Sequence, residues 1–293
     1  RDRNVVAEPD ASLLNEADKW ILSRVNRLAK DVTENMDKFE LGIAVQKVYD
    51  FIWDEFCDWY VETAKYRIYH KEEEKAAADC VLWVLKTVLK QALKLLHPFM
   101  PFITEEIYSV LVPEEESLMM SEWPQFHAEW DFPAEENVME HVKEITRGIR
   151  NMRAEMNVPN NRKTKVYVVC EDTEICDGIS TLENSIKPLM MAEKILVQQT
   201  KENIADNAVS VVVPDAVVYL PLEDLVDFEQ EMERLQKEEE KLKKEIKRAE
   251  GMLSNERFIS KAPEAKVQEE REKLEKYTQM LQQVQERMAG LKK

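Results

Sequence analysis

Asn255-Glu-Arg-Phe-Ile-Ser-Lys-Ala-Pro263 is the one break in a seven-residue repeat of apolar side chains that runs from Leu225 to the end of the chain. Before the break, the two core rows are Phe228, Leu235, Leu242 and Ala249, and Leu225, Met232, Ile246 and Leu253, the second row interrupted by Glu239. After it, they are Val267, Leu274, Leu281 and Met288, and, less regularly, Glu270, Tyr277, Val284 and Leu291. Neither half can bury so narrow a seam alone, so we expect a long antiparallel two-helix coiled-coil hairpin over residues 225–293, called the arm below.

The rest of the chain is expected to be mostly α-helical. The whole chain has 293 residues, of which 44% are hydrophobic, and it contains only five glycines and eleven prolines, a composition that favours helices. Apolar residues at helical spacing predict four helices, at about 15–37, 39–69, 72–96 and 101–113. Short joins between them predict a helical bundle over residues 1–133, and the abrupt start of the chain suggests that this bundle is truncated at its N-terminus.

A change of period follows the bundle. A helix is predicted at about 134–156, and then β-branched runs bounded by polar residues or proline predict strands at about 165–170, 194–199, 208–213 and 216–222. Residues 173–191 again have a helical pattern. We therefore expect a small α/β domain with three or four strands over residues 134–224, between the bundle and the arm.

The charge distribution argues against a general nucleic-acid binder but leaves one basic region. The net charge is −17, yet residues 1–140 carry 15 basic and 29 acidic side chains, residues 141–226 carry 10 and 13, and residues 227–293 carry 16 of each. DNA is not an expected partner, because neutralising phosphates requires lysine and arginine. The exception is the window 141–165, with seven basic and two acidic residues, where we expect an anionic partner.

The compartment is expected to be the cytoplasm. No apolar run is long enough to span a bilayer, and the first residues lack the core of a signal peptide. The cysteines, Cys57, Cys80, Cys170 and Cys176, show no Cys-x-x-Cys spacing, which favours four reduced and mostly buried thiols over disulfides or a zinc site. We expect no membrane contact and no metal site.

The sequence contains no recognisable catalytic motif. It has no glycine-rich phosphate loop, no Gly-x-Ser-x-Gly and no His-Glu-x-x-His, and its four histidines stand apart. Adjacent carboxylates such as Asp54 and Glu55 point in different directions on a helix. No catalytic residue and no cofactor are therefore predicted for this chain.

Two clusters of side chains suit an RNA partner. Lys65, Tyr66 and Arg67 end the second helix with aromatic and cationic groups together, which suits stacking on an unpaired base and pairing with a phosphate. Complementing the helix dipole is an equally good explanation of these charges. Arg147, Arg150 and Arg153 follow one another at steps of three on a helix, where they favour phosphate binding unless Glu144 and Glu155 neutralise them.

Basic residues also accompany the second half of the arm, where solvated or paired charges are the alternative to nucleic-acid contact. They are Lys261, Lys266, Arg271, Lys273 and Lys276.

Several strings resemble one enzyme family. Asp18-Lys-Trp-Ile-Leu-Ser-Arg24, Phe51-Ile-Trp-Asp-Glu-Phe-Cys-Asp-Trp-Tyr60, Leu96-His-Pro-Phe-Met-Pro-Phe-Ile-Thr-Glu-Glu106 and Trp123-Pro124 resemble the anticodon-binding helical domain of class I aminoacyl-tRNA synthetases. Val226-Asp-Phe-Glu229, Asn255, Phe258, Lys261-Ala-Pro263 and Glu270-Arg-Glu-Lys-Leu274 resemble the C-terminal coiled coil of bacterial valyl-tRNA synthetases. The resemblance covers nearly the whole chain in the right order.

The resemblance implies roles for the whole enzyme and for this piece of it. A valine–tRNA ligase uses ATP and Mg²⁺ to attach valine to tRNA(Val) and edits mischarged threonine, but the family's His-x-Gly-His, Lys-Met-Ser-Lys-Ser and editing segments do not occur here. The chain thus resembles a C-terminal piece that is expected to be inactive alone, monomeric and without a cofactor. By this resemblance the bundle and basic helix hold the anticodon stem-loop, and the arm holds the outer corner of tRNA.

The site residues expected from charge and resemblance together are few. On the anticodon side they are Lys65, Tyr66, Arg67, Arg147, Arg150 and Arg153; on the arm they are Arg271 and Lys273, where lysine stacks more weakly than arginine would. A coiled-coil module that pairs with another protein is the alternative function. A stable dimer that is lost together with the arm would favour that alternative.

Overall fold

The computed structural model describes residues 8–225, 228–254 and 264–291, and the side chains of 228–234, 264–265 and 286–291 are outside this description. The described chain is mostly helical with a small four-stranded mixed sheet. It forms two compact units, Arg1–Leu222 and Glu223–Lys293. The predicted break at 255–263 lies outside the described residues.

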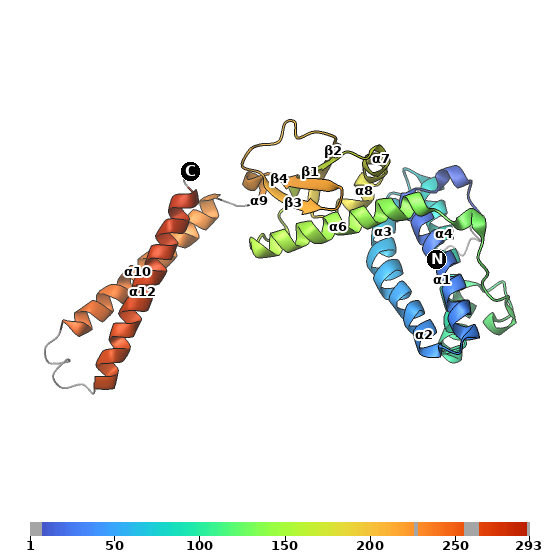
Figure 1. Cartoon of the computed structure of the whole chain (residues 1–293), viewed down its shortest axis with the longest axis horizontal. Coiled ribbons are helices and arrows are strands. Elements are labelled where there is room, and N and C mark those ends of the chain that lie inside the picture. The colour runs from blue at the N-terminus through green and yellow to red at the C-terminus, as the bar shows by residue number, and fades with distance from the viewer. Residues whose placement is uncertain (1–7, 226–227, 255–263, 292–293) are drawn as a thin grey trace. The chain divides into compact units, whose positions relative to one another are not determined.

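The helical bundle occupies the first part of the first unit (Figure 1). Its helices are α1 (Glu16–Asp37), α2 (Leu41–Asp50), α3 (Glu62–Tyr69), α4 (Lys75–Leu96) and α5 (Pro101–Leu111). Asn15 caps α1 through a reciprocal pair of hydrogen bonds with Asp18, the capping box that fixes a helix start. The interior side of α1 buries Trp20, Ile21 and Val25, so the predicted apolar stripe is the core of the bundle.

A π-helical segment joins α2 to α3. It spans Phe51–Val61, called η2 here, and makes the predicted single helix at 39–69 continuous but irregular. Because π-helical hydrogen bonds link residues five apart, the segment has wider turns than an α-helix. Phe51, Phe56 and Tyr60 consequently share the buried side with Trp59, whereas Trp53 is exposed. The aromatic residues of η2 therefore contribute to the core of the bundle, whereas Ile52 is only half-buried.

The mixed sheet follows the bundle in the same unit. Its strands are β1 (Thr164–Cys170), β2 (Ala192–Gln198), β3 (Val209–Val213) and β4 (Ala216–Leu220), in the order β2-β1-β4-β3. β1 and β2 are parallel and are connected through α7 (Thr173–Thr181) and α8 (Glu183–Ile186), whereas β4 is antiparallel to both β1 and β3. A parallel pair needs such a crossover, which accounts for the helical pattern predicted at 173–191.

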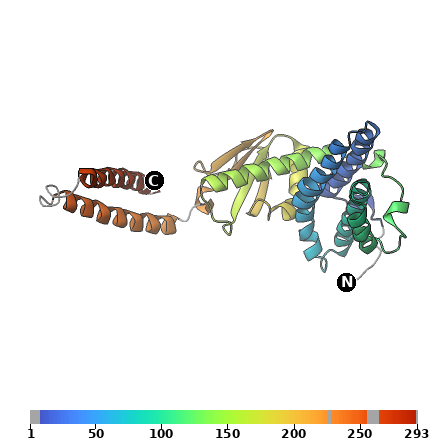
Figure 2. The same ribbon diagram turned by 90° about the horizontal axis from the view of Figure 1, so that it is seen from below.

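Helix α6 (Pro133–Glu155) connects the bundle with the sheet. It packs against α1 at one end and against β3 and α7 further along, and it runs across one face of the sheet (Figure 2). The approach to β3 is close, since a Cβ atom at Gly148 would lie 2.6 Å from Cγ1 of Val211. One rigid helix therefore fixes the bundle and the sheet relative to each other within this unit.

The second unit consists mainly of α10 (Phe228–Leu253) and α12 (Glu264–Leu291), after the short α9 (Leu222–Leu225). The two long helices lie side by side in opposite directions (Figure 1). Leu235, Leu242 and Val284 are buried between them, with Tyr277, Met280 and Leu281 packed around. Glu239, which interrupts the apolar row, accepts a hydrogen bond from Gln285 (2.8 Å) and pairs with Lys243 (2.7 Å).

The cysteines differ from the sequence-based expectation. Cys170 and Cys176 form a disulfide with their sulfur atoms 2.12 Å apart, whereas Cys57 and Cys80 are free. The expectation of four reduced thiols was therefore wrong for one pair. β1 ends at Cys170 and α7 begins at Thr173, so the chain reverses between them and returns Cys176 to the end of the strand. Spacing in the sequence alone does not reveal this reversal.

Candidate nucleic-acid interface

The residues predicted at the end of the second helix lie on α3 in two different environments. Lys65 is half-buried and pairs with Glu62 at 2.5 Å, and this hydrogen bond raises the pKa of Lys65. Tyr66 is half-buried and stacks on His70, with ring centroids 4.2 Å apart. Both side chains therefore reach the surface, where an unpaired base or a phosphate could contact them.

Arg67 lies in the interior of the bundle instead. Its Nη2 donates to Oδ1 of Asp18 at 2.5 Å, and the hydroxyl of Tyr60 donates to the same oxygen at 2.7 Å. Burial opposes the charge of Arg67, but Asp18 outweighs this effect, so the pKa of Arg67 is raised. The ion pair ties the start of α1 to α3, and the predicted RNA contact of Arg67 has no support in this arrangement.

The three arginines of α6 do not act as one cluster. Each step of three residues turns a helix by about 60° backwards, so the three side chains cover a wide arc rather than one line. Arg147 is exposed, pairs with Glu144 (2.8 Å), and lies 6.0 Å from the ring centroid of Trp59 in η2. Arg150 is also exposed and donates to the carbonyl of Leu189 at 3.2 Å.

Arg153 is buried at the end of α6. Its Nη2 donates to the carbonyls of Pro159 (3.0 Å) and Arg162 (2.6 Å), and burial lowers its pKa. It thereby holds the segment that leads into β1. Only Arg147 and Arg150 of the three remain accessible for a ligand, and Arg147 lies over the helix that continues into α3.

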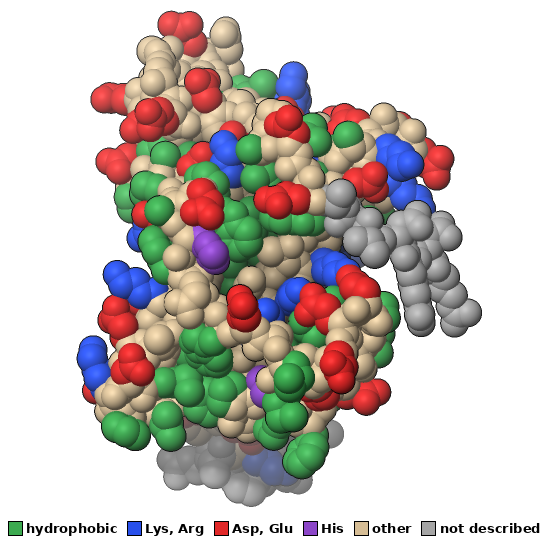
Figure 3. Space-filling model, turned by 90° about the vertical axis from the view of Figure 1, so that its right-hand side faces the viewer, with side chains coloured by type: hydrophobic (Ala, Val, Ile, Leu, Met, Phe, Trp, Pro, Cys, Tyr) green, Lys and Arg blue, Asp and Glu red, His purple; other side chains and the backbone are tan. Residues whose placement is uncertain are grey.

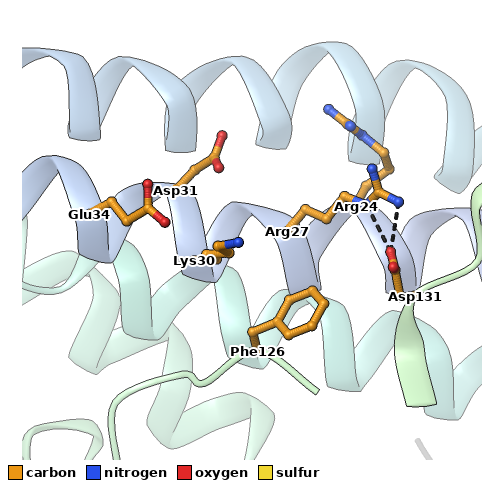
Figure 4. A pocket seen from close by; sticks show the side chains of 7 residues that line it. All are labelled: Arg24, Arg27, Lys30, Asp31, Glu34, Phe126 and Asp131. Atoms are coloured by element: carbon orange, nitrogen blue, oxygen red, sulfur yellow. Dashed lines mark hydrogen bonds and ion pairs between the residues drawn. The ribbon is translucent and has the colours of Figure 1, made fainter. Parts of the chain in front are cut away.

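A groove on α1 was missed by the sequence reasoning. It has a volume of about 510 Å³ and is lined by Arg24, Arg27, Lys30, Asp31, Glu34, Phe126 and Asp131. Figure 4 shows these side chains on both sides of α1, with Arg27 bound to Asp131 (2.7 Å) and the Phe126 ring turned toward α1. Lys30 lies 5.9 Å from the centroid of that ring and makes no ion pair within the described part of the chain.

The signal that could have revealed this groove was present in the sequence. Arg24, Arg27 and Lys30 follow one another at steps of three, the same pattern as in α6. Carboxylates of η2 and α6 neutralise the two arginines of α1. Arg24 pairs with Glu55 of η2 (2.7 Å), and Arg27 pairs with Glu136 of α6 (3.0 Å). The pattern therefore marks cations near a surface but does not say which of them are free.

The predicted arm residues lie on α12. Arg271 is exposed and makes no ion pair among the described residues. Lys273 is half-buried and pairs with Glu269 (2.7 Å) and Glu270 (3.0 Å), and these two hydrogen bonds raise its pKa. The structure thus leaves Arg271 accessible and gives Lys273 two competing carboxylates.

Further cations on the arm are exposed and form no ion pair within residues 235–254 and 266–285. Three of them, Lys241, Lys244 and Lys247, lie within two turns of one another on α10. The other two, Lys266 and Lys276, lie on either side of Arg271 in the sequence of α12. The seam between the two helices excludes these long side chains, so they remain on the outer surface of the arm.

No helix in the described part of the chain is both long and apolar enough to cross a membrane. The described residues also contain no cluster of three or more side chains suited to binding a metal ion. The sites that these residues do form are basic side chains on helical surfaces, some beside aromatic rings. A helical protein that binds an anionic polymer fits this combination.

Comparison with known families defines the class. Residues 18–168 match the model of the anticodon-binding domain of tRNA ligases, and residues 227–292 match the model of the valyl tRNA synthetase tRNA-binding arm. The first match covers α1 to β1 and the second covers α10 and α12. The chain belongs to the tRNA ligase family that carries this anticodon-binding domain.

Curated relatives narrow the resemblance to one kind of ligase. The chain is 50% identical over 275 residues to the valine–tRNA ligase of Clostridium perfringens and 48% identical over 295 residues to that of Clostridium tetani. It is 39% identical to the Bacillus subtilis valine–tRNA ligase. These matches cover 94 to 99% of the chain but only 31 to 33% of the relatives. The predicted resemblance to valyl-tRNA synthetases is confirmed, and the chain spans about a third of their length.

Proposed function

We propose that this chain is the tRNA-binding portion of a valine–tRNA ligase and that its partner is tRNA(Val). In this proposal residues 1–133 and α6 hold the anticodon stem-loop, residues 134–224 link the two binding regions, and residues 225–293 hold the outer corner of tRNA as a coiled-coil arm. The observation that carries the proposal is the match of both segments, in order, to tRNA-binding regions of tRNA ligases.

The distribution of accessible charge supports the arm's role. The net charge of the chain is −17, which repels RNA in general. The arm is different because its 16 basic and 16 acidic residues balance. Lys241, Lys244, Lys247 and Arg271 are exposed on the helix surfaces and make no ion pair with the residues that the structure describes. An RNA backbone would be attracted locally while the acidic remainder of the chain opposes unspecific binding.

Of the six residues that the sequence predicts on the anticodon side, four are accessible: Lys65, Tyr66, Arg147 and Arg150. They occupy α3 and α6, and Arg147 of α6 lies over Trp59 in η2, the segment that continues into α3. We assign Arg67 and Arg153 to positioning α1, α3 and the loop before β1, because their guanidinium groups bind Asp18 and backbone carbonyls. Lys30 and Phe126 add a further place for an unpaired base.

We propose that the ligase attaches valine to tRNA(Val) with ATP and Mg²⁺ and removes mischarged threonine, and that this chain contributes binding only. The sequence contains neither the ATP-binding strings nor the editing segment of the family. The chain alone should therefore bind tRNA as a monomer without forming valyl-tRNA.

A titration of the 293-residue chain with labelled tRNA(Val) tests the proposal. The variant K241Q/K244Q/K247Q removes three exposed cations from α10, and K187Q/K194Q/K201Q removes three cations from the linking residues 134–224 as the control. We expect the first variant to bind more weakly. The slope of log K against log salt concentration should also become shallower by about 0.7–0.9 for each phosphate contact that is lost. The control should bind like the unmodified chain.

An isolated anticodon stem-loop separates the two binding regions. Because it lacks the outer corner, its affinity should be unchanged by the arm variant but reduced by R147Q/R150Q. If the arm variant lost the same affinity for the stem-loop as for the intact tRNA, the arm would not be the part that binds the outer corner. Binding tRNA(Ile) as tightly as tRNA(Val) would contradict the choice of partner.

The protein-pairing alternative makes a different prediction. In the described part of the arm, Leu235, Leu242 and Val284 are already buried between α10 and α12, which disfavours their pairing with another protein. Sedimentation of the chain should therefore give a monomer at micromolar concentration. A stable dimer that disappears with L242A would favour the alternative.

A further inference from the structure

Helix α5 presents its more apolar side to the outside of the bundle. Thr104 and Tyr108 point inward and are buried beside Leu93 and Leu118. Phe102 is 90% exposed and Val110 71% exposed, and Ile103 and Ile107 are also exposed. A surface helix normally turns its polar side to water, and a helix that is apolar all round is normally buried. The exposed side of α5 is therefore built to be covered.

The short helix η3 (Leu118–Met120) extends this apolar surface. The side chain of Glu105 accepts hydrogen bonds from the backbone nitrogens of Leu118 (2.9 Å) and Met119 (3.3 Å), which hold η3 beside α5. Met119 and Met120 are each 73% exposed. A groove of about 410 Å³ lies between the two elements, and Phe102, Glu106 and Met119 are among the residues that line it. Figure 3 shows the bundle end of the chain, where hydrophobic side chains reach the surface among acidic ones.

We propose that the α5–η3 surface, formed by Phe102, Ile103, Ile107, Val110, Met119 and Met120, is the docking site for another segment of the ligase polypeptide. The curated relatives are about three times as long as this chain, which covers 31 to 33% of them. That length supplies a covalently attached occupant at high effective concentration. In this respect the inference rests on the proposed function, because it takes the chain to be part of a ligase.

The chemistry of the occupant follows from the surface. Apolar side chains that are unbranched or flexible, such as methionine, adapt to a neighbouring helix. Glu106 is exposed, lies one turn from both Phe102 and Val110 on α5, and makes no ion pair among the described residues. We therefore take the occupant to be an amphipathic helix whose apolar side faces α5 and which carries a lysine or arginine opposite Glu106.

Methionine oxidation measures the coverage without any substitution. In the isolated chain, Met119 and Met120 should be oxidised rapidly by dilute hydrogen peroxide, whereas the buried Met139 should not. The comparison protein is the C. perfringens valine–tRNA ligase in which this chain replaces its matching segment. Peptide mass spectrometry should show oxidation of Met119 and Met120 slowed at least fivefold there, without tRNA present.

Substitution provides the second measurement. F102E should leave the melting temperature of the isolated chain unchanged and lower that of the chimaeric ligase by about 4 °C or more, because the charge would be buried without a partner. V212E is the matched control, since Val212 is 79% exposed on β3, outside the surface. It should leave both melting temperatures unchanged.

Each other occupant gives a distinct result. Protection that appears in the isolated chain as its concentration rises would mean a second copy, and protection that requires tRNA would mean RNA. Unchanged oxidation in the chimaeric ligase would also overturn the proposal. Loss of tRNA binding by the isolated chain would instead overturn the proposed function, because methionine protection is measured without tRNA.

Discussion

The two compact units differ in that the first encloses some of its cations, whereas the arm keeps its cations on outer surfaces. In residues 1–222 many cations are bound within the protein: Arg67 to Asp18, Arg24 to Glu55, and Arg153 to backbone carbonyls. In the arm, Lys241, Lys244 and Lys247 are exposed without ion pairs in its described residues. This difference in the burial of cations arises because the bundle is several helices thick and the arm is only two. A bundle has an interior that can enclose a charge with its partner, whereas two helices have only a seam and two outer surfaces.

The largest expected effect tests the interior use of charge. D18A removes the partner of Arg67 and of the Tyr60 hydroxyl, and it should lower the free energy of unfolding of the first unit by about 3–5 kcal/mol, because a buried charge is left unpaired. Urea denaturation followed by tryptophan fluorescence measures this change, since Trp20 and Trp59 lie in that unit.

D58A is the control for that prediction, because Asp58 is exposed and makes no ion pair among the described residues. It should shift the unfolding free energy only slightly. If D18A were equally mild, the Asp18–Arg67 pair would not differ from a surface ion pair, and the contrast between the units would be weaker.

The second effect tests the seam of the arm. L242A deletes a side chain buried between α10 and α12, and it should lower the free energy of unfolding of the arm by about 2–3 kcal/mol, near the low end for core leucines because the seam is narrow. Circular dichroism should show helix lost at lower temperature while the tryptophan transition stays in place. Q236A, on the exposed side of α10, is the matched control and should keep the arm helical. Simultaneous loss of both transitions would show that the units do not unfold independently.

The smallest effect concerns the half-buried carboxylate of Glu105, which holds η3 beside α5. Hydrogen bonding from the backbone of Leu118 lowers the pKa of Glu105 below its ordinary value of 4.5. The contact therefore stabilises the folded state above the unfolded-state pKa, and this contribution is lost as the pH falls through the lower folded-state value. NMR amide shifts of Leu118 and Met119 should titrate below pH 4.5 in the unmodified chain and in E106Q, but not in E105Q. Identical titration in E105Q would exclude Glu105 as the anchor of η3.

The helices were largely predictable, but one local conformation was not. Apolar spacing predicted α1 and α4, because this signal is local. The π-helical segment was missed since its pattern over Phe51–Val61 differs from an α-helix only in which aromatic residues become buried. The pairing of Cys170 with Cys176 depended on the chain reversal after β1.

The candidate site was predictable in its residue types but not in its accessible members. Lys65, Arg147 and Arg271 reach the surface, and Arg67 and Arg153 do not. A sequence shows that arginines are spaced along a helix. Partners far away in the chain, such as Asp18 for Arg67, decide which of these arginines are paired inside the protein. The groove beside Phe126 was missed for the same reason, because its walls come from segments about a hundred residues apart.

By itself, the sequence determined the mostly helical class with a small sheet and the resemblance to valyl-tRNA synthetases, because periodicity and short strings are local properties of the chain. The tertiary structure decided which cations are enclosed and which face outward, and it exposed the apolar side of α5. Burial depends on what packs against a side chain, and for Arg67, Phe102 and Lys30 that is set by distant segments.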